Sequence, residues 1–380
     1  MRSLPKEGFL FTTRAYESWL RRSTPVIAAG LARKHALMRA DVGRFLRGTY
    51  YRWAAQFPQV CPTLSNTLRV LSVGDAHIEN FGTWRDVEGR LVWGINDVDE
   101  AWRLPVANDL VRVLTSALIA RRSRRAIGWL AARQLSAALD AGYRDAIQAG
   151  GLPYVLAESH PALRLLALRR VNDPVKWWTT LESECRSVRH VPAPVQKLLT
   201  ASVPMGAVVA RWAAREAGVG SLGRERFVVI ADYAGGRIAR EAKPSLLSAA
   251  AWDRGVLDAE PLGAELLQRA ARAPDPCLRF ERGWMIRRLA PDCSRVSLIA
   301  LPSPDDQREL LHAMGGELAN LHLGHASART LRSALASWSS RDLLTGARAM
   351  RAVVDTDWAE FCDTVPHRAR KSSSSSAPSV

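Results

Sequence analysis

Residues 68–97 read LRVLSVGDAHIENFGTWRDVEGRLVWGIND, and this stretch decides the fold class. Leu68–Val73 is rich in apolar and β-branched residues and predicts a short strand. A polar loop follows it, and Phe81–Trp84 and Arg90–Ile95 are two further strand-like runs on either side of a turn-forming segment. The stretch therefore predicts a strand, a polar loop and a β-hairpin, in that order.

The polar loop carries side chains that suit phosphoryl transfer. Asp75 lies five positions before Asn80, and His77 lies between them. The hairpin then returns the chain to Asp97. In phosphoryl transfer one carboxylate positions or deprotonates the acceptor hydroxyl, while an amide oxygen and a second carboxylate hold Mg²⁺ against the nucleotide phosphates. The loop can supply all three groups, although in isolation its pattern is also that of an ordinary Asx turn with a capping histidine.

A glycine-rich loop further along the chain supports the same chemistry. Its candidate nucleotide-binding residues are Gly218, Gly220, Ser221 and Gly223. A dinucleotide fingerprint with this glycine spacing opens a helix, whereas Arg226–Tyr233 predicts a strand, and a tight turn leads from it to a second strand that ends at Lys243. A phosphate-covering kinase loop precedes such a hairpin, whose second strand supplies a lysine to the phosphates. The pattern therefore predicts an ATP site.

The polar loop resembles the catalytic segment of kinases of the aminoglycoside-phosphotransferase type, which carry His-Gly-Asp-Leu-His-Pro-x-Asn, a hairpin and then Ile-Asp. Four residues match this motif position for position: Gly74, Asp75, His77 and Asn80. The later element is matched by Ile95–Asp97, whereas Val73 stands where the motif has its first histidine. The resemblance covers two short segments joined by a hairpin.

This resemblance implies a division of roles among the residues of the site. Asp75 is the catalytic base and His77 a second catalytic residue. Asn80 and Asp97 bind Mg²⁺. Because the hairpin between them is longer than usual, Asp99, or the glutamate after it, could bind the metal in place of Asp97.

The segment from Gly218 to Arg295 is similar, in its order of elements, to the small lobe of a protein kinase. A hairpin, a helical segment, a strand pair at Cys277–Glu281 and Trp284–Leu289, and a connector follow one another. In ordinary kinases this lobe precedes the catalytic loop, whereas here it follows Asp75 in the chain. A cut in an exposed connection permutes a chain in this way, and the alternative is a coincidental match.

We therefore predict an α+β, two-lobed protein-kinase-like fold, circularly permuted, with a small β-rich lobe and a large, mostly helical lobe. The predicted domains are a large helical lobe with the catalytic loop and the metal-binding hairpin at 1–216, a small β-rich nucleotide-binding lobe at 217–295, C-terminal helices that complete the large lobe at 296–366, and a disordered tail at 367–380. The Ala-, Leu- and Arg-rich region from Asn108 to about Ala217 is expected to be helical.

Over about Lys34 to Ala326 the chain is identified as a member of an uncharacterised bacterial family, domain of unknown function 2252. The motifs that carry this resemblance are Phe45–Gly48, Gly74–Gly82, Asn96–Glu100, Asn108–Arg112, Gly218–Gly223, Arg240–Ser245 and Ile286–Pro291. The family name implies no established reaction. Many relatives have Lys-Glu-Ala where this chain has Arg240-Glu-Ala, so either Lys243 or Arg240 contacts the phosphates.

Several further residues have both a functional and a structural explanation. Asp109 either braces the catalytic loop or caps a helix, and Arg47 and Arg287 either reach phosphate oxygens or pair with carboxylates. Glu241 or Glu265 could pair with the hairpin lysine. Three histidines of a later Ala- and Leu-rich helix are interpreted as packing residues: His312, His322 and His325.

The composition favours a folded protein with anionic partners. The 380-residue chain is 47% hydrophobic, and 53 Lys and Arg against 37 Asp and Glu give a net charge of +16. Only six of these cations are lysines, so an arginine bias weakens the argument from charge. Five widely separated cysteines without a CxxC pair argue against a disulfide framework and a zinc knuckle. Neither a signal peptide nor a membrane span is recognisable, and we expect a cytoplasmic protein.

The function that these observations predict is Mg²⁺-dependent transfer of the ATP γ-phosphoryl group to a hydroxyl on a small-molecule or protein acceptor of unknown identity. A kinase-like nucleotide-binding protein without turnover is the alternative that keeps the same pocket. A basic nucleic-acid-binding protein is less favoured, because no recognised nucleic-acid motif accompanies the charge.

Overall fold

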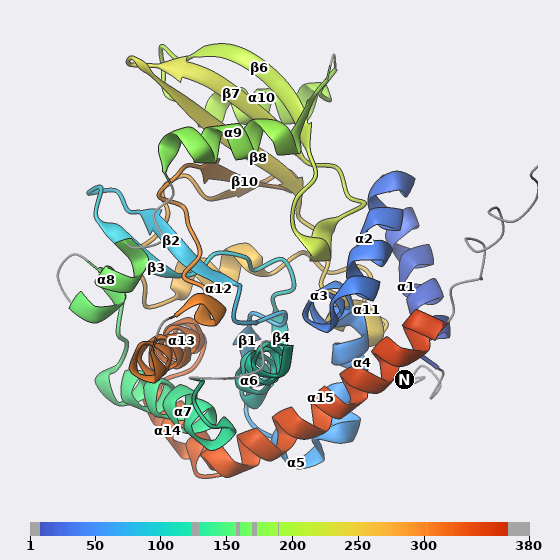
Figure 1. Ribbon diagram of the computed structural model, residues 1–380, viewed down its shortest axis with the longest axis vertical. Coiled ribbons are helices and arrows are strands. Elements are labelled where there is room, and N and C mark those ends of the chain that lie inside the picture. The colour runs from blue at the N-terminus through green and yellow to red at the C-terminus, as the bar shows by residue number, and fades with distance from the viewer. Residues whose placement is uncertain are drawn as a thin grey trace, which may run out of the picture.

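The computed structural model describes residues 8–123, 129–156, 160–168, 173–188, 190–301 and 303–363. The fold is α+β, with a six-stranded antiparallel sheet at one end of the molecule and a helical body at the other (Figure 1). The predicted disordered tail lies outside the described residues. None of the described helices is long and apolar enough to cross a lipid bilayer.

The large sheet has the strand order β5-β6-β7-β8-β10-β9. Its strands are β5 (Cys185–Ser187), β6 (Val208–Arg215), β7 (Phe227–Tyr233), β8 (Gly236–Pro244), β9 (Arg279–Glu281) and β10 (Trp284–Leu289). Helix α9 (Pro174–Glu184) packs Leu181 against one face, and α10 (Ala193–Ser202) packs Leu199 against the other. Alternate residues of β7 supply the two faces, as the period of a strand requires. The predicted strand pairs at 226–243 and 277–289 are confirmed.

Two strands of the large sheet lie in the region that the sequence predicts as helical. Strands β5 and β6 both fall before residue 217, so the prediction of helix up to Ala217 is wrong at its end. The Ala- and Arg-rich composition of β6 suits a helix, but its ladder with β7, from Val208 opposite Asp232 to Ala214 opposite Phe227, holds it extended. The large sheet therefore begins before the predicted boundary of the β-rich lobe.

The helical body contains two short strand pairs and most of the helices. β1 (Arg69–Ser72) pairs with β4 (Trp102–Pro105), and β2 (Phe81–Arg85) pairs with β3 (Leu91–Ile95). The helices are α1 (Phe9–Ser23), α2 (Ala28–Ala40), α3 (Val42–Gly48), α4 (Tyr50–Val60), α5 (Pro62–Ser65), α6 (Ala107–Ser123), α7 (Ala132–Ala149), α8 (Pro161–Leu168), α11 (Ala249–Asp253), α12 (Gly263–Arg269), α13 (Pro304–Leu323), α14 (Ala328–Leu335) and α15 (Ser340–Asp363), with the 3₁₀ turn η2 (Leu298–Ala300). The predicted strand, loop and hairpin are confirmed, whereas β4 is an addition.

Close packing of α7 on α13 forms the centre of the helical body. A Cβ on Gly142 would lie 1.8 Å from the carbonyl oxygen of His312, and one on Gly315 would lie 2.0 Å from that of Leu139. Only glycine permits these approaches. Helix α13 begins at Ser303, whose side chain accepts a hydrogen bond from a backbone N–H of the first turn. The core under the loops of the site is therefore rigidly packed.

Candidate functional site

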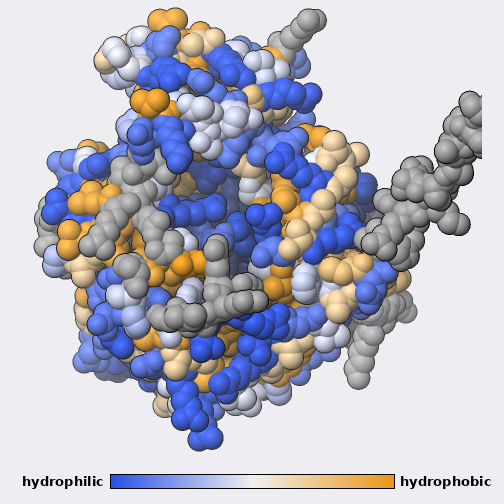
Figure 2. Space-filling model, viewed as in Figure 1, coloured by the Kyte–Doolittle hydropathy of each residue, from blue (hydrophilic) through white to orange (hydrophobic). Residues whose placement is uncertain are grey.

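A cavity of about 740 Å³ lies between the large sheet and the helical body. Figure 2 shows a hollow surrounded mainly by hydrophilic residues at this place. Most of the predicted site residues line the cavity: Asp75, His77, Asn80, Asp97, Asp99, Gly218, Gly220 and Ser221. They come from the loop after β1, the segment after β3 and the loop between β6 and β7. The fold thus brings the two predicted motifs, which are far apart in sequence, to one cavity.

A buried carboxylate on α6 holds the loop that carries Asp75. The two oxygens of Asp109 accept hydrogen bonds from the backbone N–H groups of Val73 (2.7 Å) and Gly74 (3.0 Å). Gly74 has a φ of 79°, and a Cβ there would lie 2.3 Å from the carbonyl oxygen of Glu100. The position therefore requires glycine. Of the two explanations for Asp109, the brace of the loop is confirmed.

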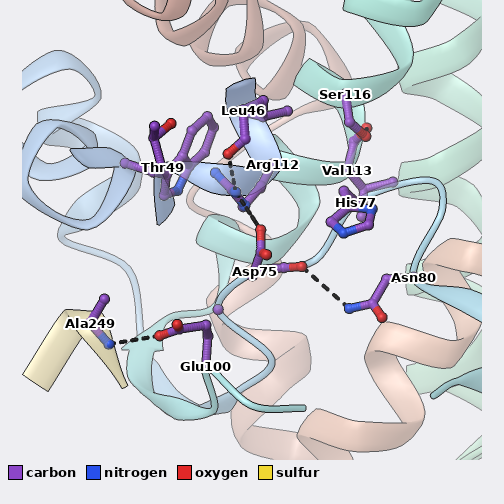
Figure 3. Close-up of polar contacts among 12 residues, drawn as sticks. Leu46, Thr49, Asp75, His77, Asn80, Glu100, Arg112, Val113, Ser116 and Ala249 are labelled. Atoms are coloured by element: carbon purple, nitrogen blue, oxygen red, sulfur yellow. Dashed lines mark hydrogen bonds and ion pairs between the residues drawn. The ribbon is translucent and has the colours of Figure 1, made fainter. Parts of the chain in front are cut away.

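Asp75 itself is held by a buried arginine of α6. Arg112 donates through Nε (2.8 Å) and Nη2 to one oxygen of Asp75, and through Nη2 to the carbonyl oxygen of Leu46 at 3.0 Å (Figure 3). The guanidinium also lies 5.0 Å from the ring centre of Tyr50 and 4.8 Å from that of Trp53. Burial raises the pKa of Asp75 to about 6, even though the charge of Arg112 opposes the rise. This pKa lies in the range that a general base needs near neutrality.

Asn80 ties this loop to the segment after β3. Its amide nitrogen donates to the carbonyl oxygen of Asp97 at 2.9 Å. It also donates to the carbonyl oxygen of Asp75 at 3.3 Å (Figure 3). Both bonds use the NH₂ group, so the amide oxygen of Asn80 is left for another partner. Asn80 and Asp97 are therefore neighbours in the cavity, as the sequence predicts.

Lys243 from β8 reaches the two carboxylates that follow β3. Its Nζ donates to Oδ1 of Asp97 at 3.0 Å and to Oδ2 of Asp99 at 2.5 Å, and its side chain is only 3% exposed. Burial raises the pKa of Asp97, but the charges of Lys243 and Arg287 outweigh it and hold this pKa well below its usual range. Burial and the nearby Asp97 raise the pKa of Asp99. Lys243 thus lies behind the cavity wall, bound to two of its carboxylates.

The alternation of side chains along β8 separates Lys243 from Arg240. Arg240 points to the opposite face of the sheet, where its Nε donates to the carbonyl oxygen of Ser202 at the end of α10 (3.1 Å). Neither Arg240 nor Lys243 is one of the residues that line the cavity. Of the two cations that the sequence offers for the phosphates, only Lys243 is on the side of the site.

Glu241, which shares the face of Lys243, binds other partners. This fully buried carboxylate pairs with three arginines at 2.6 to 2.7 Å: Arg215, Arg226 and Arg287. Glu265 lies instead 3.4 Å from Arg103. The expected pairing of Lys243 with Glu241 or Glu265 is therefore wrong, and Arg287 is a partner of a carboxylate.

The glycine loop lies against α2. Its middle forms the 3₁₀ turn η1 (Val219–Ser221), and three of the four predicted nucleotide-binding residues of the loop line the cavity: Gly218, Gly220 and Ser221. Gly223 turns away from the cavity, with a φ of 92°, and a Cβ there would lie 3.2 Å from the backbone nitrogen of Leu31. The carbonyl oxygen of Gly223 accepts a hydrogen bond from Ile27 at 2.7 Å. Gly223 therefore anchors the loop to α2 and does not line the site.

His77 is a neutral side chain in the cavity wall. Burial, followed by the charges of Arg47 and Arg112, lowers its pKa well below the usual value. Nδ1 accepts a hydrogen bond from the backbone N–H of Glu79 at 3.2 Å, so the neutral ring carries its proton on Nε2. Arg47 is itself paired with the Glu79 carboxylate. His77 can therefore donate a hydrogen bond but is a poor base.

Of the three histidines expected to be packing residues, His322 is buried in α13, whereas His312 and His325 are partly exposed, and His325 lies in the turn after the helix. His312 contacts Asp145 at 2.8 Å, His322 contacts the hydroxyl of Tyr143 at 2.8 Å, and His325 contacts the carbonyl oxygen of Leu266 at 3.5 Å. None of the three histidines is among the residues that line the cavity.

Sequence reasoning missed most of the basic residues that complete the cavity wall: Arg33, Lys34, Arg215, Arg224, Arg226, Arg272, Arg288 and Arg295. They come from α2, from β6, from the segment before β7, from the segment between α12 and β9, and from β10 and the segment after it, and so from unrelated parts of the chain. In a chain so rich in arginine no local pattern distinguishes these residues. The scarcity of lysine was the only signal that could have drawn attention to Lys34.

The side-chain oxygens of Asn80 and Asp97 are ligands of the kind that a hard cation such as Mg²⁺ prefers. Among the residues that the structure describes, no group of three or more His, Cys, Asp or Glu side chains is arranged to hold a metal ion. Mg²⁺, however, takes only one or two protein oxygens and completes its shell with water and phosphate oxygens. The amide oxygen of Asn80 and the carboxylate of Asp97 or Asp99 fit this requirement, and Lys243 binds one oxygen of each carboxylate.

Comparison with known proteins identifies one related family. A family model described as "Uncharacterized protein conserved in bacteria (DUF2252)" matches residues 27–160, and this match confirms the predicted resemblance over that part of the chain. The range includes the loop of Asp75, the β2–β3 hairpin and α6. No curated protein and no solved structure matches the chain. The resemblance to aminoglycoside-type kinases stays a prediction from the motifs.

Proposed function

We propose that the protein is an ATP- and Mg²⁺-dependent phosphotransferase that acts on a hydroxyl-bearing acceptor, with a permuted, kinase-like two-lobed fold. The observation that carries this proposal is the ion pair between Lys243 and Asp97, two residues 146 positions apart. The first ends the hairpin after the glycine loop, and the second is the acid that the catalytic motif assigns to the metal. A coincidental match of two short motifs gives no reason for their side chains to touch.

The nucleotide is proposed to lie with its phosphates between the glycine loop and Asn80. Backbone N–H groups near Gly218 and Gly220 face the phosphates, and Lys243 exchanges Asp99 for a phosphate oxygen. Asn80 and Asp97 would hold Mg²⁺, which when bound neutralises the charge on the phosphates and aligns them.

Asp75 is the group that orients the acceptor. Because Arg112 binds one of its oxygens, the other oxygen is the one that accepts a hydrogen bond from the acceptor hydroxyl. With a pKa of about 6 the carboxyl is ionised at pH 7 and can take the hydroxyl proton. Arg112 fixes the direction of this carboxylate in the same way that a buried partner fixes other catalytic bases.

Calorimetric titration with ATP, with and without Mg²⁺, tests the nucleotide site. We expect Mg²⁺-dependent binding, weakened at least tenfold by Asp97→Asn and by Lys243→Met, because a charge-assisted contact is worth roughly 1.5–3 kcal/mol. Asp305→Asn, at a side chain that is 87% exposed, and Lys197→Met, on the outside of α10, are matched controls that leave binding unchanged. A folded wild-type protein that does not bind ATP overturns the proposal.

Turnover is tested separately with Asp75→Asn. This substitution is expected to keep ATP binding and to lower ADP release, measured against a panel of hydroxyl compounds, by roughly 10²–10⁴-fold, the usual contribution of a general base. Equal turnover by this variant and the wild type removes Asp75 from the mechanism.

A nucleotide-binding protein without turnover is the second candidate. The double hydrogen bond from Arg112 to Asp75 favours it, because a carboxylate neutralised by a buried guanidinium is a weaker base. Mg²⁺-dependent ATP binding by the wild type with no ADP release on any acceptor, and no change on Asp75→Asn, would establish this candidate in place of the first.

A further inference from the structure

The cavity extends past Asp75 to a wall that the nucleotide proposal does not use. We call it the basic wall, and it consists of Tyr16 on α1, Lys34 on α2, Tyr50 on α4 and Arg224 after the glycine loop. Arg224 donates through Nη2 to the hydroxyl of Tyr16 at 3.3 Å, and Lys34 donates to the carbonyl oxygen of Gly220 at 3.4 Å. Figure 1 shows α2 beside the glycine loop, on the far side of that loop from α9 and α10.

The two cations of the basic wall have no ion-pair partner in the described part of the chain, although the carboxylate of Glu100 lines the same cavity and acts on both of them at longer range. Among the residues that the structure describes, no carboxylate oxygen lies within 4.0 Å of Lys34 Nζ or of the Arg224 guanidinium. By contrast, Arg47 pairs with Glu79 and Arg226 pairs with Glu241 in the same cavity. Lys34 is only 7% exposed, and burying an unpaired charge destabilises a protein. Such a charge is retained where a ligand supplies the counter-ion.

Hydrogen-bond donors at the same wall are unused as well. The hydroxyl of Tyr50 is buried and has no partner in the described part of the chain, and the same holds for Nε of Arg224. Burial raises the pKa of Tyr16 and of Tyr50, so both phenols keep their protons and can donate. Two cations and two hydroxyls therefore face the cavity with bonds still to make.

We propose that the basic wall binds a phosphate monoester group on the acceptor, so that the substrate of the reaction proposed above is a phosphorylated compound with a free hydroxyl. This inference rests on the proposed function for the role of acceptor, but the anion site itself stands on the wall alone. A phosphate dianion has three terminal oxygens, which a guanidinium, an ammonium and phenol hydroxyls can bind together. A polycationic acceptor such as an aminoglycoside is disfavoured by the same charges.

The position of the wall suits this role. Asp75 lines the same cavity as Lys34 and Tyr16, so a compound held at the wall shares the cavity with the base. The acceptor hydroxyl oxygen bonds to the γ-phosphorus, the bond from that phosphorus to the bridging oxygen breaks, the proton passes to Asp75 and ADP leaves. In this arrangement Lys243 and Asp97 bind the nucleotide and its Mg²⁺, and Lys34 and Arg224 bind the phosphate group of the acceptor.

The test uses methyl phosphate, the smallest monoester, added to wild-type protein saturated with Mg²⁺ and a non-hydrolysable imido analogue of ATP. Calorimetry at constant ionic strength is expected to detect its binding, with acetate bound at least tenfold more weakly. Lys34→Met and Arg224→Gln are each expected to weaken methyl phosphate at least tenfold. Tyr50→Phe, which removes only an unpartnered hydroxyl, is expected to weaken it several-fold while keeping the fold.

The controls separate this site from the nucleotide site. Lys197→Met and Arg14→Gln remove exposed cations on α10 and α1 and are expected to leave methyl phosphate binding unchanged. The affinity for the ATP analogue should be equal in all variants. The inference is overturned if the wild type does not bind methyl phosphate, or if it binds acetate as tightly as the monoester. A parallel loss of nucleotide affinity in Lys34→Met and Arg224→Gln also overturns it, since those cations then belong to the nucleotide.

Failure of the nucleotide proposal gives a different result. If the analogue does not bind, the same titration of the free protein with methyl phosphate still decides whether the basic wall is an anion site. Binding that depends on Lys34 and Arg224 then keeps the site and removes only its role as acceptor subsite.

Discussion

Replacing Lys34 with methionine is expected to make the protein more stable at neutral pH. The side chain is buried on α2 and has no carboxylate partner among the described residues. Burial, and then the like charge of Arg224, lowers the pKa of Lys34 from 10.5 to about 8. The charged ammonium of Lys34 therefore destabilises the folded state, whereas a methionine of similar length fills the same space without charge.

The magnitude follows from linkage between protonation and folding. At pH 7 the ammonium is charged in both states, and a lowering of the folded pKa by about 2.5 costs the folded state about 3 kcal/mol, at about 1.4 kcal/mol for each pH unit. The pKa of Lys34 is higher in the unfolded state than in the folded state, so this destabilisation of the folded state is fully present below pH 8. It shrinks as the pH rises from 8 to 10.5, because the folded protein releases the proton first.

Thermal unfolding of the wild type and of Lys34→Met at pH 7 and pH 10 measures this effect. We expect the variant to unfold roughly 4 °C higher at pH 7, given about 2.1 cal/mol/K of unfolding entropy per residue, and less than about 1 °C higher at pH 10. Lys197→Met, at an exposed position, controls for the loss of a charge. A variant less stable than the wild type, or a difference that does not change with pH, refutes the reasoning.

Two further substitutions test how the cavity is built. Glu241→Gln leaves the buried Arg226 and the partly exposed Arg215 and Arg287 short of a negative charge, and is expected to lower the free energy of unfolding by about 3–5 kcal/mol in urea. The same change at Glu182, half-exposed on α9, should cost less than about 1 kcal/mol. Gly30→Ala places a Cβ 2.9 Å from the backbone nitrogen of Gly223, so it must displace the glycine loop and weaken ATP binding while the fold persists; unchanged affinity would show that the loop does not contact the nucleotide.

The local elements of the site were predictable from sequence. The strand, loop and hairpin at 68–97 and the hairpin at 226–243 depend on turn residues and on alternation over a few positions, and both are present. These features are encoded locally, so a single sequence reveals them.

The predictions that failed concern residues whose environment comes from distant segments. β6 has the composition of a helix, and only its ladder with β7 makes it a strand. Glu241 and Lys243 share one face of β8, yet the first meets arginines of the sheet and the second meets acids of the helical body. Neither the strand conformation of β6 nor the partners of Glu241 and Lys243 can be predicted from the order of residues, because the partners lie in other parts of the chain.

The sequence by itself therefore determined the chemical groups of this protein and the short elements that carry them. The tertiary structure decided which of those groups come together: Arg112 with Asp75, Lys243 with Asp97, and Lys34 and Arg224 on one wall of the cavity with Glu100 nearby. The physical reason is the range of the interactions. Turns, strand periods and capping act over a few residues, whereas burial, pairing of charge and the pKa of a side chain depend on everything that packs around it.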